Sequence, residues 1–363
     1  MGFLLPILHW FCLYLKSYKI VGTPNCYRTA DEKLFISFVF AESPAGKDGW
    51  KRGWEITQIN GKPIAEYKTS TGGYDFKLGG SDPGISNSFT FKLPDGSTTT
   101  RTNVKAEYQS NSVLDQRIIQ VDTKKVGYWA YQSFKATAGL SPTRSAEVQT
   151  SMEFFQNQGV QELVIDLRYN GGGSVAVAEQ ICNYLIQTAN NSKLMYTNKL
   201  NAMKTAQNTS RNFSKIGTIS LSRVIFLTSR SSASASELII NALEPYMQVV
   251  LIGDNTFGKP VGSFPLSSYN RILQTNNVEV VPITFAIANA AGKAEYFEGF
   301  PANFKVGDSP QFAWGDVKDL RLAAAIQYIR TGTVGNRMKD TYYKPNWEMI
   351  DAFKGLQQEF PVF

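Results

Sequence analysis

Strands and helices alternate along the middle of the chain, and this order restricts the possible folds more than any other feature. Short apolar runs rich in β-branched residues predict buried strands, and the segments between them carry apolar residues at helical spacing. Repeated β-α-β order predicts an α/β fold, in which a mainly parallel sheet is covered by helices and ligands bind at the carboxyl ends of the strands. The strands are predicted at 126–131, 162–167, 224–227 and 249–252, and the helices at 145–158, 175–186, 234–246 and 319–330.

The part of the chain before this alternation predicts a separate β-rich module, from about residue 1 to 108. With 363 residues, the chain is long enough for two domains. A long polar insertion at 189–218 is predicted to be a surface excursion from the second domain. The module's predicted elements are a strand at 34–40, a turn at 43–46, a strand around Ile56 and Ile59 that ends in an Asn-Gly hairpin turn, and a hairpin of 88–93 with 99–105.

The N-terminal segment contains an apolar run at 3–15. This run is shorter than the roughly 20 residues that a membrane-spanning helix needs. It could be the core of a signal peptide, but no positive residue precedes it and no small-residue cleavage site follows it. We favour a third interpretation, in which it forms the first strand of a folded domain.

Charge and histidine content exclude several classes of function. The net charge of +7 is spread along the chain without a long basic run, which does not favour nucleic-acid binding. The single histidine, His9, lies in the apolar N-terminal run, so a Ser-His-Asp triad and a zinc site with several imidazoles are nearly excluded. The 3 cysteines are far apart, with neither a disulfide framework nor metal-ligand spacing. We expect no metal or small-molecule cofactor, and any catalysis must proceed without histidine.

A glycine run follows the second predicted strand. Residues 166–173 read Asp-Leu-Arg-Tyr-Asn-Gly-Gly-Gly. Glycines after a buried strand let backbone N–H groups approach a ligand closely, which suits an oxyanion hole or an anion site. A phosphate-binding loop is not expected, because no Gly-Lys-Ser/Thr follows. A tight turn between strand and helix explains this segment equally well on its own.

Two further segments follow the next two strands. The stretch 228–237 is rich in serine, and one hydroxyl could lie exposed at a helix N-terminus. The alternative is a capping box, with Ser234 as the cap and Glu237 as its partner. The stretch 255–262 carries Lys259, which would be a usable base if partial burial lowers its pKa, although a lysine in a loop is usually solvated.

These segments together resemble the C-terminal processing (tail-specific) serine peptidases. The family's Ser-Ala-Ser-Glu motif matches 234–237, and its Thr-Phe-Gly-Lys motif matches 256–259 at the family's spacing. Its Asp-Leu-Arg-Asn-Asn-Pro-Gly-Gly segment is similar to 166–173, and its PDZ domain is similar to 43–61. The resemblance implies a catalytic core with the ClpP/crotonase-like fold and a Ser-Lys dyad.

The resemblance also implies a role for individual residues. Ser234 would be the nucleophile and Lys259 the general base, while Glu237 would orient the site. The backbone N–H groups of Ala235 and of Gly172 or its neighbour Gly173 would form the oxyanion hole. The PDZ-like module would hold the substrate's free C-terminus by adding it as a strand. The residues that resemble the carboxylate-capping turn of PDZ domains are Gly2, Phe3 and Leu4.

The resulting expectation is a serine endopeptidase that acts on protein or peptide substrates. We expect an N-terminally shortened PDZ-like domain at 1–108, a catalytic domain at 109–331 and a tail at 332–363 that packs on the core. An inactive peptide-binding member of the same fold is the alternative, and an acyl-CoA enzyme of the crotonase type is a weaker one because no carboxylate pair is found at the strand ends. The family resemblance implies the bacterial cell envelope, with membrane proximity through a signal or lipid anchor that this sequence does not show.

Overall fold

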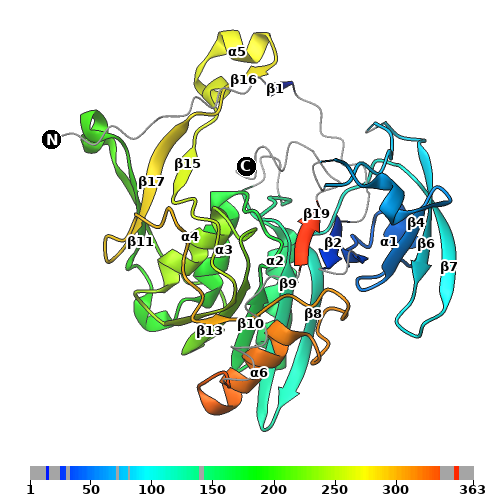
Figure 1. Cartoon of the computed structure of the whole chain (residues 1–363). Coiled ribbons are helices and arrows are strands. Elements are labelled where there is room, and N and C mark those ends of the chain that lie inside the picture. The colour runs from blue at the N-terminus through cyan, green and yellow to red at the C-terminus, as the bar shows by residue number, and fades with distance from the viewer. Residues whose placement is uncertain are drawn as a thin grey trace.

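A mixed α/β region and an N-terminal β-rich region make up the described structure (Figure 1). The computed structural model describes residues 14–15, 25–29, 33–70, 73–80, 82–138, 143–335 and 347–350. The larger region is built on a 6-stranded sheet in the order β18-β14-β13-β10-β9-β8, in which only the β8–β9 pair is antiparallel. Its strands are β8 (Val113–Val121), β9 (Lys124–Tyr131), β10 (Glu162–Asp166), β13 (Arg223–Thr228), β14 (Gln248–Gly253) and β18 (Phe304–Lys305).

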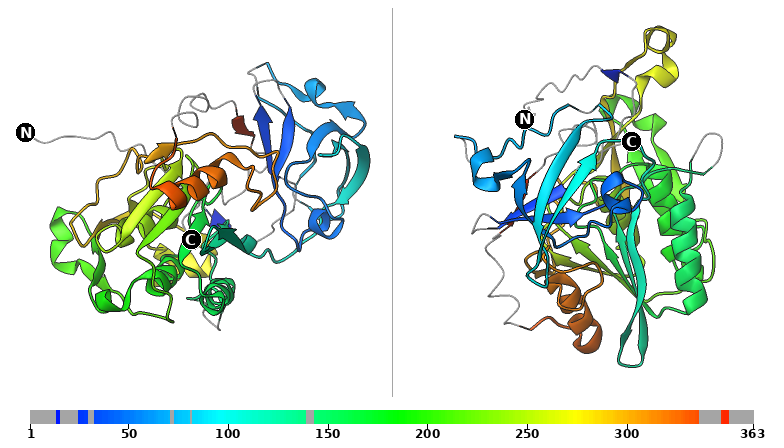
Figure 2. Two further views of the ribbon diagram at one scale, coloured as in Figure 1. Left: turned by 90° about the horizontal axis from the view of Figure 1, so that it is seen from below. Right: turned by 90° about the vertical axis from the view of Figure 1, so that its right-hand side faces the viewer.

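Helices cover both faces of this sheet, as the sequence pattern predicts. Successive residues of a strand point to opposite faces of the sheet, and both faces are apolar here. Trp129 and Ile165 belong to the hydrophobic cluster on one face, whereas Tyr128 and Val164 belong to the cluster on the other. The first cluster contains the buried faces of α2, α3 and α4, and the second that of α6, so α6 lies opposite the other three (Figure 2). The helices are α2 (Ala146–Gln158), α3 (Val175–Leu185), α4 (Ala235–Leu243) and α6 (Leu320–Thr331).

Local signals set the ends of these helices. The Ser145 side chain accepts a hydrogen bond from the Val148 N–H at the start of α2, and Gly159 ends it in the left-handed conformation, with φ 66°. Asp319 caps α6 in the same way through the Leu322 N–H. Helix α4 ends at Leu243, earlier than predicted.

The N-terminal region is a 7-stranded sheet with the order β19-β2-β3-β4-β6-β7, and β5 pairs with β4. The predicted Asn-Gly hairpin is confirmed, with φ 50° at Asn60 and 75° at Gly61. The predicted turn at 43–46 is wrong, because Ser43 caps a short helix there and Pro44 supplies its first residue. The elements are β2 (Asn25–Thr29), β3 (Leu34–Phe38), α1 (Pro44–Lys47), β4 (Glu55–Ile59), β5 (Lys62–Pro63), η1 (Ile64–Tyr67), β6 (Ser86–Lys92), β7 (Thr98–Val104) and β19 (Trp347–Ile350).

Strand β19 belongs to the predicted C-terminal tail. It pairs with β2, so this part of the tail adds to the N-terminal sheet, while Val334 at the start of the tail is buried in the cluster that contains α6. The first strand predicted at 3–15 lies outside the described residues except for β1 (Tyr14–Leu15), which pairs with β16. None of the helices in the described part of the chain is long and apolar enough to cross a membrane.

Most of the predicted surface excursion at 189–218 is exposed, and it contributes β11 and β12 to a second, 4-stranded sheet with the order β12-β11-β17-β15. The segment is mostly polar, but three of its apolar side chains, Met195, Tyr196 and Phe213, are buried in the core and hold it in place. Strands β15 and β17 carry a projecting arm that ends in α5 (Figure 1). The elements are η2 (Thr188–Asn190), β11 (Leu194–Lys199), η3 (Ala202–Gln207), β12 (Thr209–Asn212), β15 (Val261–Ser263), η4 (Leu266–Tyr269), α5 (Arg271–Thr275), β16 (Val278–Glu279) and β17 (Ile283–Asn289).

Candidate active site

Ser234 lies at a sharp turn between β13 and α4. Its backbone has φ 54° and ψ −111°, a combination that is rare for a residue other than glycine. Such a conformation persists only where surrounding contacts impose it, and it is frequent at functional positions. Here the N–H of Ser234 donates to Oε2 of Glu237 at 3.0 Å, and its carbonyl accepts from the Leu238 N–H at 2.8 Å. Ser234 is partly exposed, whereas Ala233 and Ala235 on either side are buried.

Three other serines of the 228–237 stretch have structural partners. The hydroxyl of Ser232 donates to the Leu167 carbonyl at 2.8 Å, and that of Ser236 donates to the Asn170 carbonyl at 3.0 Å. The Ser229 hydroxyl donates to the Arg168 carbonyl. These bonds fasten the turn to the loop that follows β10. The serine-rich composition is therefore explained by contact between two loops, and it leaves Ser234 partly exposed.

The glycine run packs directly against this turn. A Cβ atom on Gly172 would lie 2.8 Å from Cβ of Ser234 and 3.0 Å from the Ala235 nitrogen, and one on Gly173 would lie 2.6 Å from the Phe134 carbonyl oxygen. The Gly172 N–H donates to Oδ1 of Asn170 at 2.9 Å. The N–H groups of Gly173 and Ala235 have no hydrogen-bond partner in the described part of the chain. Gly173 and Ala235 are therefore the better placed of the predicted donors.

Alanine in place of Gly172 is expected to disable the site. The residue has φ 109°, and the added methyl group would push on Ser234, so we expect a loss of about 1–3 kcal/mol in unfolding free energy and a large loss of activity. Gly159→Ala is the control, because that glycine also has a positive φ of 66° but nothing lies within 4 Å of an added Cβ. It should lose only about 1–2 kcal/mol and keep its activity. Urea unfolding and casein cleavage measure the two effects, and full activity in Gly172→Ala would contradict the close packing described.

Glu237 joins the two segments that carry the predicted dyad. Its buried carboxylate accepts hydrogen bonds from the backbone N–H groups of Ser234, Gly258 and Lys259 at 3.0, 2.7 and 2.8 Å. It also accepts one from the Thr256 hydroxyl at 2.6 Å. Burial raises the pKa of Glu237 above its usual value, although these four bonds act in the opposite direction. The carboxylate thus fixes the backbone of both predicted catalytic residues.

Lys259 has the partial burial that its predicted role requires. Burial lowers the pKa of its ammonium from 10.5 to about 8, and the Glu237 charge opposes this shift. A substantial fraction of the side chain is consequently neutral near pH 8, where an amine can accept a proton.

A change of Glu237 to glutamine tests this arrangement. One of the two acceptor oxygens becomes an NH2 group that faces N–H donors, so we expect about 1–3 kcal/mol of lost stability and reduced activity. Loss of the negative charge should also lower the pKa of Lys259 further, which moves the pH-activity profile to lower pH. Glu153→Gln, at an exposed position of α2, is the control and should leave the profile unchanged. An unshifted profile in Glu237→Gln would show that the carboxylate does not act on Lys259.

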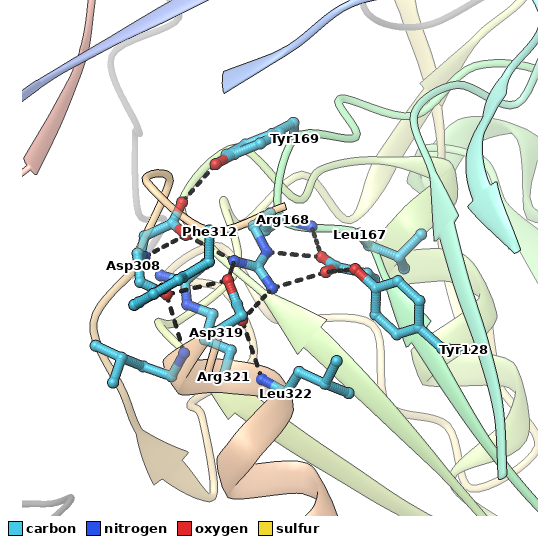
Figure 3. Close-up of polar contacts among 12 residues, drawn as sticks. Tyr128, Leu167, Arg168, Tyr169, Asp308, Phe312, Asp319, Arg321 and Leu322 are labelled. Atoms are coloured by element: carbon cyan, nitrogen blue, oxygen red, sulfur yellow. Dashed lines mark hydrogen bonds and ion pairs between the residues drawn. The ribbon is translucent and has the colours of Figure 1, made fainter. Parts of the chain in front are cut away.

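A buried charge cluster supports the loop before the glycine run. Arg168 is 1% exposed, and its guanidinium contacts Asp166 at 2.7 Å, Asp308 at 2.6 Å and Asp319 at 2.8 Å (Figure 3). Tyr128 donates to Asp166 at 2.8 Å from the neighbouring strand β9. Carboxylates from β10, from the 306–319 loop and from the start of α6 therefore bind the Arg168 guanidinium, and they hold in place the loop that carries Asn170 and the glycines.

The N-terminal region contributes Arg52 to the same cluster. Its side chain donates to the Ser37 carbonyl and to the Tyr169 hydroxyl, both at 2.7 Å, and to the Phe312 carbonyl at 2.9 Å. The Tyr169 hydroxyl in turn donates to Asp308 at 2.7 Å. This chain of contacts connects the N-terminal sheet to the loop that carries the glycine run. Arg52, Asp308 and Asp319 were not predicted from the sequence as parts of the site.

Comparison with known proteins identifies the central region. Residues 125–279 match the model of peptidase family S41. This part of the chain is a peptidase family S41 domain. The match includes β10, the serine-rich turn, the lysine segment and β15. It therefore holds Ser234, Glu237 and Lys259, whereas Arg52, Asp308 and Asp319 lie outside it.

Relatives with C-terminal processing names agree with this assignment. The chain is 26% identical over 223 residues to carboxyl-terminal-processing peptidase 3 of Arabidopsis thaliana chloroplasts, which covers 60% of this chain and 41% of that protein. It is 27% identical over 230 residues to the protease CtpB of Bacillus subtilis, which covers 63% of this chain and 44% of that protein. The chain thus spans about two fifths of the length of these curated relatives. Both relatives carry the names of C-terminal processing peptidases, in agreement with the S41 match.

A solved structure extends the likeness to the overall fold. A protein of Bacteroides fragilis NCTC 9343, provisionally assigned to the S41 proteases, superposes with a TM-score of 0.69 at 26% identity, and the match covers 89% of this chain and 82% of that one. The mixed α/β fold with its sheets is therefore similar to that of an S41 structure.

The structure brings most of the predicted site residues together. Ser234, Ala235 and Glu237 lie at the start of α4, Gly172 and Gly173 pack beside them, and the backbone of Lys259 is bonded to Glu237. The predicted substrate-binding residues Gly2, Phe3 and Leu4 lie outside the described residues. Asn170 and Thr256 were missed, although both lie inside the motifs that the sequence shows.

Proposed function

We propose that this chain is a serine endopeptidase with Ser234 as nucleophile and Lys259 as general base. The observation that carries the proposal is the Glu237 carboxylate, which bonds the backbone N–H groups of both residues at 3.0 and 2.8 Å. The lowered pKa of Lys259, about 8, supports its role as the base. No step needs histidine, in agreement with the single His9 of the sequence.

The proposed reaction follows the usual order of acyl transfer. Neutral Lys259 accepts the Ser234 hydroxyl proton while Oγ attacks the peptide carbonyl carbon. The N–H groups of Gly173 and Ala235 donate to the oxyanion that forms. The Lys259 ammonium then protonates the leaving amine, and the C–N bond breaks to give an acyl-enzyme. Water hydrolyses this ester, with Lys259 again accepting and returning the proton.

The fold and domain assignments belong to the same proposal. We assign residues 109–331 to a ClpP/crotonase-like catalytic domain and residues up to 108 to a PDZ-like domain that holds the substrate's C-terminus by strand addition. The antiparallel sheet of the N-terminal region and its short helix α1 agree with such a module. From family resemblance, we place the protein at the bacterial cell envelope and expect unfolded or extended protein segments as substrates.

Labelling with a fluorophosphonate probe and digestion of casein test the dyad in parallel. We expect the wild type to label or to cleave casein, and Ser234→Ala and Lys259→Ala to do neither. Ser234→Ala should lose at most the roughly 1 kcal/mol of a helix cap, so circular dichroism can verify that it is folded. Full casein cleavage by Ser234→Ala would exclude Ser234 as the nucleophile. A wild type that is inactive in both assays would favour the alternative, an inactive peptide-binding protein.

A further inference from the structure

Strand β15 is an open edge that starts two residues after Lys259. It is the last strand in the order β12-β11-β17-β15 and, among the described residues, pairs on one side only, with β17 (Figure 1). The Ile287 N–H donates to the Pro260 carbonyl at 2.9 Å, which makes Pro260 and Ile287 a hydrogen-bonded pair of this antiparallel ladder. The next pair, Val261 and Ala286, is therefore a non-bonded pair. It follows that the N–H and C=O of Val261 point away from β17, toward the open edge.

The chain segment that forms this edge carries no charged residue. Residues 260–270 contain no Asp, Glu, Lys or Arg, although proteins commonly protect an open strand edge with charge. Phe264 is 40% exposed and Ile283 is 67% exposed, and Ile283 lies opposite Ser263 in the β15–β17 ladder. Farther along the same arm, Tyr269 and Ile272 are exposed as well. Large apolar side chains thus gather on the arm that borders the site.

Two prolines and a bulge restrict how much of the edge can pair. Pro260 and Pro265 flank β15, and the register shifts between Gly262 and Ser263. A continuous sheet between two molecules would need a longer regular edge. A short extended segment needs only a few residues, and main-chain pairing is independent of its sequence.

We propose that the open edge of β15 binds an extended segment of the substrate as an added strand, with Phe264 and Ile283 contacting its apolar side chains. The substrate class is then an unfolded polypeptide segment with apolar residues and no proline at the paired positions. The interaction rests on the Ser234–Lys259 site of the proposed function, because pairing at Val261 would carry the substrate main chain past Lys259.

Binding can be tested without cleavage in the Ser234→Ala variant. The probe is a synthetic peptide of alanine, valine and lysine, capped at both ends and N-methylated at one position at a time. We expect the effect of N-methylation on affinity to alternate along the peptide. Methylation should weaken binding about tenfold where the peptide N–H faces Val261, and should have little effect at the positions between. Hydrogen exchange at the Val261 amide should slow when the unmethylated peptide is bound.

Substitutions on the arm provide a second readout. Phe264→Ser and Ile283→Ser should each weaken peptide binding by about tenfold. Val317→Ser is the matched control, because Val317 is 55% exposed but lies outside the arm, and it should bind normally. Equal effects of methylation at all positions, or unchanged exchange at Val261, would overturn the assignment of β15. Failure of the strand-binding proposal can be distinguished from failure of the proposed function. If the peptide binds with the expected period but the wild type cleaves no substrate, the β15 site is supported and the Ser234–Lys259 dyad is excluded.

A second copy of the chain is the other possible occupant of the edge. Dimerisation that the peptide abolishes would identify this occupant, and would also overturn the assignment.

Discussion

Methionine in place of Lys259 is expected to lower kcat/KM for casein or peptide hydrolysis by about 10³-fold or more. Methionine is close in length to lysine but cannot accept the Ser234 proton, so the proposed nucleophile would stay a weakly reactive hydroxyl. The backbone N–H of residue 259 is retained, and its bond to Glu237 should persist. The substitution should therefore remove the proposed base and leave the arrangement of the backbone intact.

The lowered pKa of Lys259 also predicts that this variant is stably folded. The ammonium has a pKa of about 8 in the folded protein and 10.5 when exposed, so the unfolded chain binds the proton more tightly. Burial of the charged form consequently costs stability below about pH 8, and the stability of the wild type rises with pH between about 8 and 10.5. Methionine has no charge to bury, so its stability should lack this rise and should not fall below that of the wild type near pH 7.

The pH profile of the wild type provides the direct measurement. Activity should increase as pH rises through about 8, because the fraction of neutral Lys259 increases there. Lys215→Met is the matched control, since burial lowers the pKa of Lys215 to about 8 as well, but its ammonium donates to the Tyr184 and Ile219 carbonyls. This control should keep the profile of the wild type. An activity that does not depend on pH between 7 and 9, or that survives in Lys259→Met, would exclude Lys259 as the base.

The sequence predicts the parallel core of the fold well because its signals are local. Strands such as β10 are continuous apolar runs, and α2 has both a serine cap and a terminal glycine. Strands β8 and β11 were not predicted, because polar residues interrupt their apolar pattern and pairing with neighbouring strands helps to hold them in place. The short helix α1 was not predicted, because Pro44 is favoured both in turns and at the first position of a helix, and Gly46 favours a turn.

The candidate site could be predicted where motifs lie on neighbouring strand ends. Ser234 and Lys259 follow β13 and β14, which pair directly, so their segments meet at one edge of the sheet. Gly173 is preferred over Gly172 as an oxyanion donor because the Gly172 N–H already donates to the Asn170 side chain. Residue types alone do not specify which of the two N–H groups makes that bond. The partners of Arg168 are 140 and 151 residues away in the chain, which no local pattern reveals.

Methionine in place of Arg168 is expected to destabilise the protein by about 3–5 kcal/mol, the largest stability effect that we predict. Arg168 is fully surrounded by protein and contacts three carboxylates, from Asp166, Asp308 and Asp319. Its loss would leave their charges buried without this guanidinium, and two cations, Arg52 and Arg321, would remain to balance them. Denaturant unfolding measures the change. Arg330→Met is the control, because Arg330 forms an exposed pair with Asp122 at 3.2 Å, and it should lose at most about 1 kcal/mol.

The dependence of this difference on pH separates charge from packing. Burial alone would raise the pKa of Asp308 and of Asp319, but Arg168, Arg52 and the hydrogen bonds to these carboxylates together hold both pKa values below the usual range. Carboxyls with a lowered pKa stabilise the folded state fully above their unfolded pKa of about 3.9, and this stabilisation is lost as the pH falls toward their folded values. The gap between the wild type and Arg168→Met should therefore be constant from pH 7 to about pH 5 and should shrink at lower pH. A gap that stays the same at low pH would mean that Arg168 stabilises the loop by packing, and that the charges of the cluster contribute little.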